Sequence, residues 1–345
     1  MGRRGMALVA VLAAVLAAVL AMAGCGGSGG GDTGGEVRLG VGGQPLLVYL
    51  PTTLADRLGY YRDEGLNVRI EDLQGGSKAL QALQGGSVDV VSGYYDHTIR
   101  MQAKKRDVVA FVNMLRYPSL VLAVSPKASK PINSVADLKG TKVGVTAPGS
   151  STDFYLKYLL VQHGLAATDA APQAVGGDSS AVAAMETGQV DAAVMLDPAF
   201  SLLRKRVGAD AVRVLSDTRT AEGVQRDLKV ATYPAAVLYS DARWLRDNPD
   251  TARKLARAIK RALDYVHSHS GADIAAKMPP EYSAGDADIY AQAIDSAKPA
   301  FSPDGRIETS GAQAVHGVLK AFTPEIAQAN IDVSKTFTND YLGTP

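Results

Sequence analysis

Apolar and polar positions along residues 36–240 alternate between two spacings, one typical of strands and one typical of helices. The first strand pattern, Val37–Val41, ends at a Gly-Gly pair. A helical stripe follows it, with apolar residues three or four positions apart from Leu46 to Leu58. Strands that alternate with helices in this way predict right-handed βαβ units and a mostly parallel sheet.

The same alternation occurs twice. Strands are predicted first at Val37–Val41, Asn67–Leu73, Val88–Ser92 and Val108–Val112, and then at Lys142–Thr146, Gln173–Val175, Val190–Leu196 and Ala211–Leu215. From Asp241 the pattern is nearly all helical, with an apolar stripe from Leu245 to Val266 around the start signal Asn248-Pro249. The chain therefore predicts two α/β units followed by a helical region.

A short sequence motif, which we call the echo, occurs twice, at the junctions of these units. Tyr117-Pro118 precedes an apolar run to Leu122, and Tyr233-Pro234 precedes a similar run to Leu238. We interpret the two runs as strands that cross between two lobes, with chance similarity as the alternative. The predicted lobes are residues 36–120 together with 235–345, and residues 121–234.

Composition narrows the class of protein. Apolar residues make up 46% of the 345 residues and charged residues 21%, which argues against a disordered chain, a coiled coil or a polytopic membrane protein. The 36 basic residues balance 35 acidic ones without a basic stripe, so nucleic acid is not an expected partner. One cysteine, Cys25, excludes a disulfide framework or a zinc knuckle.

The N-terminus reads as an export signal. Arg3 and Arg4 precede an apolar run from Met6 to Ala23, and small residues lead to Cys25. Met22-Ala23-Gly24-Cys25 resembles the bacterial lipoprotein box, although the box prefers Leu where this chain has Met22. The prediction is a signal peptide over residues 1–25 with Cys25 as the lipidation site; a retained anchor or ordinary secretion is the alternative. Residues 26–35, rich in Gly, predict a flexible tether.

Several motifs of the body resemble a known family. They are Leu58-Gly59-Tyr60-Tyr61-Arg62-Asp63-Glu64-Gly65-Leu66-Asn67-Val68, Gly75-Gly76-Ser77, Gly86-Ser87-Val88-Asp89-Val90, Val135 to Val145, and Gly188-Gln189-Val190-Asp191. Together they are similar to the nitrate/sulfonate/bicarbonate and thiamine-precursor substrate-binding proteins of ABC importers. The resemblance covers roughly residues 36–340, and it does not name the ligand.

The resemblance implies a fold, a function and partners. The implied fold is a type II periplasmic-binding-protein fold of class α/β, with two lobes that close on a solute. The implied function is an exported receptor, monomeric and tethered by its lipid, that passes a small molecule to a permease and its ATPase. No cofactor, metal or catalytic residue is expected. An enzyme on the same fold, such as a pyrimidine synthase or a dehydratase, and a sensor without a transport role are the alternatives.

Candidate ligand residues stand where the strands end, because solutes bind beyond the carboxyl ends of strands in open α/β sheets. The set comprises Gln44, Gly76, Ser77, Tyr94, Tyr95, Asp96, His97, Pro148, Gly149, Ser150, Ser151, Thr152, Asp197 and Tyr233. Glycines and hydroxyls at the start of a helix can cradle an anionic group, and aromatic residues can stack on a ring.

Each candidate also has a plain structural interpretation. The hydroxyls and Asp197 are ordinary helix-capping residues, and one of Tyr94 and Tyr95 can belong to the core with Asp96 as a cap. His267 and His269 lie two residues apart and do not share a helix face, so they do not indicate a metal site. No Arg or Lys stands at a predicted strand end. The sequence therefore leaves two ligand classes open: an anion held by neutral donors, and a neutral or heteroaromatic solute.

Overall fold

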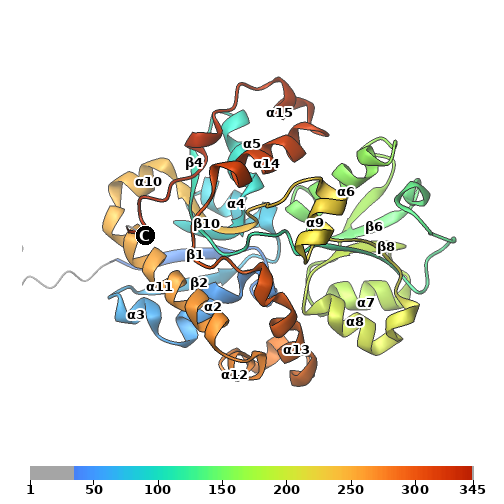
Figure 1. The fold of residues 1–345 in the computed structure, drawn as a ribbon, viewed down its shortest axis with the longest axis horizontal. Coiled ribbons are helices and arrows are strands. Elements are labelled where there is room, and N and C mark those ends of the chain that lie inside the picture. Colours follow the sequence, from blue (N-terminus) through green and yellow to red (C-terminus); the bar gives the residue numbers. More distant parts are fainter. Residues whose placement is uncertain (1–34, 344–345) are drawn as a thin grey trace, which may run out of the picture. The chain divides into compact units, whose positions relative to one another are not determined.

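The computed structural model describes residues 35–343 of the chain, so the predicted signal peptide, Cys25 and most of the tether lie outside the described residues. Figure 1 shows two mixed sheets flanked by helices, which confirms the predicted α/β class. Among the described residues, no helix combines the length and the apolar character needed to cross a bilayer.

The first sheet has the strand order β2-β1-β3-β10-β4. Strands β1, β2 and β3 run parallel, while β10 pairs antiparallel with both β3 and β4. We call this sheet and its helices lobe 1. Its elements before the first crossing are β1 (Val37–Val41), η1 (Leu47–Tyr49), α2 (Leu50–Arg57), α3 (Tyr60–Asp63), β2 (Val68–Asp72), α4 (Gly76–Gln84), β3 (Val90–Tyr94), α5 (Asp96–Ala103) and β4 (Val108–Asn113).

The second sheet has the order β7-β6-β8-β5-β9, and its fourth strand, β5, is again antiparallel to both neighbours. We call this sheet and its helices lobe 2. Its elements are β5 (Val121–Val124), η2 (Val135–Leu138), β6 (Lys142–Val145), α6 (Ser151–Gln162), β7 (Ala171–Ala174), α7 (Ser179–Thr187), β8 (Ala192–Met195), α8 (Ala199–Val207), η3 (Ala209–Ala211), β9 (Val214–Asp217) and α9 (Ala221–Leu228).

The chain then returns to the first sheet and ends in helices, as the pattern after Asp241 predicts. The last elements are β10 (Ala236–Asp241), α10 (Ala242–Asp247), α11 (Pro249–Ser268), α12 (Gly271–Ala275), η4 (Pro280–Ser283), α13 (Ala287–Ala297), η5 (Lys298–Ala300), α14 (Thr309–Lys320), α15 (Pro324–Gln328) and η6 (Val333–Lys335). The predicted stripe on α11 is confirmed, because Leu255, Ile259 and Leu263 are fully buried. Pro249 starts this helix, where its missing N–H costs nothing.

The two echo runs are the crossing segments, but the strands begin later than predicted. β5 starts at Val121 and β10 at Ala236, a few residues after each Tyr-Pro pair. Pro118 has no N–H to donate to a sheet, and Ser119 has a φ of 55°, a left-handed conformation that ends extended backbone. The strand predicted at Val88–Ser92 is likewise displaced, since β3 covers Val90–Tyr94.

Helices cover both faces of each sheet. In Figure 1, α6 and α9 lie on one side of the second sheet and α7 and α8 on the other. In lobe 1, α2 and α11 pack together on one face, and α5 and α14 pack together on the other. The carboxyl ends of β1 and β3 and those of β6 and β8 therefore meet between the lobes, where loops lead into helices on either side.

Candidate functional site

Predicted residues from both lobes meet in a cluster at the strand ends, which we call the strand-end cluster. It consists of Gly76, Ser77, Tyr94, Asp96, Ser150, Ser151 and Thr152. The Ser77 backbone N–H donates to Ser150 Oγ at 3.0 Å, and Ser150 Oγ donates to Ser77 Oγ at 3.2 Å. Ser151 Oγ donates to Asp96 Oδ1 at 2.9 Å. These bonds join residues 55 to 73 positions apart in sequence, so the topology assembles the cluster.

Glycine makes the close approach of the lobes feasible. A Cβ added to Gly75 would lie 3.0 Å from the Cβ of Ala147 in the other lobe. A Cβ added to Gly76 would lie 3.1 Å from His97 Nε2. A larger residue at Gly75 would push the start of α4 away from Ala147 of the other lobe, whereas one at Gly76 would first meet His97 within lobe 1.

Asp96 and His97 are buried at this contact. Burial raises the pKa of Asp96 to about 6, and the hydrogen bond from Ser151 and the Arg100 charge only partly oppose that shift. Burial, with Arg100 nearby, lowers the pKa of His97 to about 3. His97 Nε2 lies 4.0 Å from Asp96 Oδ1, yet a histidine with this pKa is neutral near pH 7 and forms no ion pair there.

Little free space remains around the strand-end cluster. A cavity bounded by Gly76, Tyr94 and Ser150 measures about 10 Å³. A second one, lined by aromatic side chains that include Tyr94, Tyr155 and Tyr233, measures about 20 Å³. Each has room for roughly one water molecule. In this closed arrangement the cluster forms contacts between the lobes rather than an empty site.

Seven predicted residues line neither of these cavities: Gln44, Ser77, Tyr95, His97, Pro148, Gly149 and Asp197. Tyr95 is fully buried in lobe 1, where its hydroxyl contacts Thr336 and its ring packs edge-on against Phe337, so it is a core residue. His97 is also fully buried, with neither ring nitrogen hydrogen-bonded to a described residue. The Gln44 side chain donates to Thr53, and Pro148 is exposed. Tyr95 and the His97 ring are thus buried and line neither small cavity, and their contact with a solute stays a prediction.

Gly149 and Thr152 hold the loop between β6 and α6 in shape. Gly149 has a φ of 80°, its N–H donates to Asp153 Oδ2 at 2.7 Å, and its carbonyl accepts from Arg100 at 3.3 Å. Thr152 Oγ1 accepts from the Thr146 backbone N–H at 3.0 Å. Both residues position the serines of the cluster.

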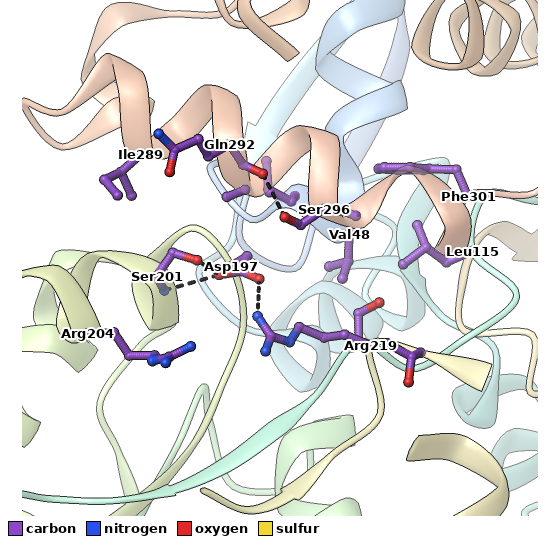
Figure 2. Close-up of a pocket in the computed structure, with 15 residues that line it drawn as sticks. Val48, Leu115, Asp197, Ser201, Arg204, Arg219, Ile289, Gln292, Ser296 and Phe301 are labelled. Carbon is purple, nitrogen blue, oxygen red and sulfur yellow. Dashed lines mark hydrogen bonds and ion pairs between the residues drawn. The ribbon is translucent and has the colours of Figure 1, made fainter. Parts of the chain in front are cut away.

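A much larger cavity, of about 340 Å³, lies between the lobes on the side of α8 and α13 (Figure 2). Its lining residues are Leu47, Val48, Leu115, Ser119, Asp197, Ser201, Arg204, Arg219, Thr220, Ile289, Gln292, Ala293, Ser296, Ala297 and Phe301. They come from both lobes and from the C-terminal helix α13. Of the predicted residues, only Asp197 belongs to this lining.

Asp197 is the polar centre of this cavity. Its Oδ1 accepts from Ser201 Oγ at 2.6 Å and from the Ser201 N–H at 3.1 Å. Its Oδ2 pairs with an Arg219 nitrogen at 3.1 Å, and Arg219 also pairs with Asp217 at 2.6 Å. The two carboxylates raise the pKa of Arg219 despite its partial burial. The helix itself is capped one residue later than predicted, at Pro198.

The expectation that no Arg or Lys is well placed concerns five candidate strand ends, and the end of β9 is not one of them. β9 ends at Asp217, two residues beyond its predicted end at Leu215, and Arg219 follows after Thr218. Arg204, on α8, also borders the cavity, and it has no ion pair with any residue of 35–343. The cavity therefore contains two guanidinium groups, one of them already neutralised.

The comparisons with known proteins agree with this architecture. The family model described as NMT1/THI5 like matches residues 48–272. A solved protein of Bordetella bronchiseptica RB50 is 40% identical, with a TM-score of 0.85 over 89% of this chain and 95% of that one. The alkanesulfonate-binding protein SsuA of Xanthomonas axonopodis pv. citri, solved bound to MOPS, is 18% identical, with a TM-score of 0.70 over 88% of this chain and 98% of that one.

The chain is also similar to a protein that is named as an enzyme rather than as a binding protein. The 4-amino-5-hydroxymethyl-2-methylpyrimidine phosphate synthase of Aspergillus parasiticus is 26% identical over 224 residues, which is 63% of this chain and 63% of the synthase. The likeness to SsuA confirms the predicted two-lobed periplasmic-binding-protein fold. With its family model matched over residues 48–272, the chain belongs to the NMT1/THI5-like family.

Proposed function

We propose that the protein is an exported receptor that binds a small organic solute between its lobes and delivers it to an ABC importer. The observation that carries the proposal is the 340 Å³ cavity, because its walls come from both lobes and from α13. Its volume falls within the range of small-molecule sites, about 300–1,000 Å³. A solute in this position would hold the two lobes together.

The strand-end cluster supplies the closing contacts in this proposal. Separation of the lobes would break the Ser77–Ser150 and Ser151–Asp96 hydrogen bonds and open the two small cavities. Gly76, Tyr94, Thr152 and Tyr233 would then line the entrance on that side. A solute drives closing only as far as its affinity for the closed form exceeds its affinity for the open form.

Arg204 is the proposed contact for an anionic group of the solute. It is exposed at the cavity and has no acidic partner within residues 35–343, so its charge is free to pair with a ligand. Arg219 would hold the neighbouring wall in place, because its guanidinium is already bound by Asp197 and Asp217.

Export follows from the sequence in this proposal. The signal-like residues before Cys25 would be removed, and Cys25, as the first residue of the mature chain, would carry the lipid that tethers the receptor to the membrane. The solved relatives with this fold include SsuA, a solute-binding protein, which suits an extracytoplasmic location.

An enzyme is the second candidate, because the Aspergillus relative is named as a synthase. The paired buried groups Asp96 and His97 are the only adjacent acid and base at the strand ends. In the closed form, however, the His97 ring nitrogens are sealed from both cavities. Proton transfer to a bound substrate needs direct or water-mediated reach, which this arrangement does not provide.

A thermal-shift screen of the chain from residue 26 onward tests the proposal. The panel contains nitrate, bicarbonate, aliphatic and aromatic sulfonates, carboxylates and pyrimidines. A solute at about 100 times its Kd adds about 2.7 kcal/mol to the stability, a midpoint shift of several degrees. Mass spectrometry of each compound after incubation separates a receptor, which returns it unchanged, from an enzyme.

Arg204→Gln identifies the cavity used. It should weaken binding of an anionic solute by about fivefold to tenfold. Arg206→Gln is the matched control, because Arg206 lies on the same helix but pairs with Glu186 of α7, and neither residue lines the cavity. Equal losses in both variants would contradict the placement of the site. A flat panel together with a converted compound would support the synthase instead.

A further inference from the structure

The 340 Å³ cavity is one end of a longer groove between the lobes. A second cavity of about 220 Å³ adjoins it at Ile289. A third, of about 250 Å³, shares Pro45, Leu46, Asp178 and Ser179 with the second. We call the three together the cleft groove; it passes from Arg219 and Arg204 at one end to Asp72 and Gln74 at the other.

The two ends of the cleft groove differ in the charges that have no partner. At the first end, Arg219 is held between the carboxylates of Asp197 and Asp217, and Arg204 is a cation without an acidic partner among the described residues. Asp178, Asp72 and Glu281 line the second and third cavities, and none forms an ion pair with a described cation. Among the described residues that line these two cavities there is no Lys, Arg or His.

The hydrogen bonds at the acidic end leave its charges in place. Asp72 Oδ1 accepts from the backbone N–H groups of Gln44 and Gln74, at 3.1 and 2.9 Å. Asp178 Oδ1 accepts from the Ser180 N–H at 3.0 Å and caps α7. These donors are neutral N–H groups, so they orient the carboxylates without pairing them with a cation.

The second cavity combines an apolar wall with acidic residues. Leu46, Pro198, Ala199, Leu202 and Ile289 form the apolar wall, and Asp178 and Glu281 line the same cavity. An inorganic oxyanion would leave this apolar wall and the acidic end without a partner. A solute that satisfies the whole groove needs an apolar body with charge at both ends.

We propose that the cleft groove binds an elongated dipolar organic solute, with its anionic group at Arg204 and its cationic amine toward Asp178 and Glu281. The inference rests on the proposed receptor function and names the class of solute for that same site. Charge complementarity along the groove selects this class over solutes with a single charge. The contacts are exposed and screened by solvent, so each contributes a modest factor in affinity.

Matched series of compounds provide the test. The probes are the ω-amino acids from β-alanine to ε-aminocaproate, each with the acid that lacks the amine and the amine that lacks the acid. Isothermal titration on the chain from residue 26 onward measures their affinities. At the chain length that fits, we expect the amino acid to bind about tenfold more tightly than either singly charged analogue.

Substitutions at each end of the cleft groove test which charged group of the solute binds there. Asp178→Asn should weaken the amino acid about threefold and leave the acid without an amine unchanged. Arg204→Gln should weaken both. Asp288→Asn is the control, since Asp288 is exposed on α13 and lines none of the three cavities.

The outcomes separate this inference from the function on which it rests. If the singly charged acid binds as tightly as the amino acid and Asp178→Asn has no effect, the dipolar class is wrong while the receptor stands. If an amine binds without its acid, the assignment of Arg204 is wrong. If no ω-amino acid binds, the inference fails; if the broader panel of anions and pyrimidines also gives no shift, the receptor function fails with it.

Discussion

The two sides of the space between the lobes differ sharply. On the side of α4, α5 and α6, serines and glycines bring the lobes into hydrogen-bonding contact and leave cavities of about 10 and 20 Å³. On the side of α8 and α13, the same lobes are separated by cavities of about 340, 220 and 250 Å³. Close packing and room for a solute are therefore divided between two sides of one interface.

Residue size accounts for much of this difference. Gly75 has no side chain to hold the lobes apart, and Ser77 and Ser150 are short enough to bond directly. On the other side α13 stands at the interface, joined to α8 through the Lys205–Asp286 ion pair. In the proposed receptor, the strand-end cluster would supply the closing contacts and the cleft groove would bind the solute.

Among the variants considered, replacement of Phe154, on the packed side of the interface, should cause the largest loss of stability. Its ring lies edge-on to His97 at 6.0 Å, and the Arg100 guanidinium sits 3.8 Å from the ring centre, so both contacts cross between lobes. Phe154→Ala should cost about 3 kcal/mol of stability and favour the open form. Chemical denaturation and the radius of gyration in solution measure the two consequences.

Phe111→Ala is the matched control for that variant. Phe111 is fully buried within lobe 1 against Tyr341, away from the other lobe. It should lose similar stability while its radius of gyration stays at the parent value. An unchanged radius for Phe154→Ala would show that the packed side does not govern closing.

The stability of the folded protein should depend on pH through Asp96 and His97, an opposed pair whose contributions change in opposite directions. The pKa of Asp96 is about 6 in the folded protein, above its ordinary 3.8, so the folded state takes up a proton and gains stability as pH falls from about 6 to about 4. The pKa of His97 is about 3, below its ordinary 6.5, so the folded state loses stability as pH falls from about 6.5 toward about 3. In the parent the two slopes largely cancel.

Single variants should separate these slopes. Relative to the parent, Asp96→Asn leaves the histidine alone and should lose about 1–2 kcal/mol of stability between about pH 6.5 and about pH 4.5. His97→Gln leaves the carboxyl alone and should gain a similar amount over that range. Denaturation at several pH values measures both, and parallel profiles for the two variants would contradict the opposed pair.

The smallest effect is expected at the exposed ion pair that joins α8 to α13. Lys205 and Asp286 are partly solvated, and exposed pairs contribute about 0–1 kcal/mol. Lys205→Ala should therefore shift the unfolding midpoint by less than about 2 °C, with the shift shrinking further in high salt. A loss as large as that of Phe154→Ala would show that α13 is held mainly by this pair.

Local patterns predict most of the fold but only part of the site. The alternation of apolar residues locates both sheets. Tyr94 and Tyr95 are neighbours in sequence and face opposite ways: Tyr94 lines the small cavities and Tyr95 lies in the core. The strand-end rule finds Ser77 and Ser150, whereas an error of two residues at the end of β9 hides Arg219. Gln292 and Ser296 give no local signal, because their role depends on where α13 docks.

The position of α13 also limits what can be inferred from membership of the NMT1/THI5-like family. The segment shared with the NMT1/THI5-like family ends at residue 272, while Ile289, Gln292, Ser296 and Phe301 lie downstream of it and form one wall of the large cavity. In the proposed receptor, part of the selectivity for the solute would therefore depend on residues outside the segment that the family model matches. Two members with the same inherited core can differ in cargo through this wall alone.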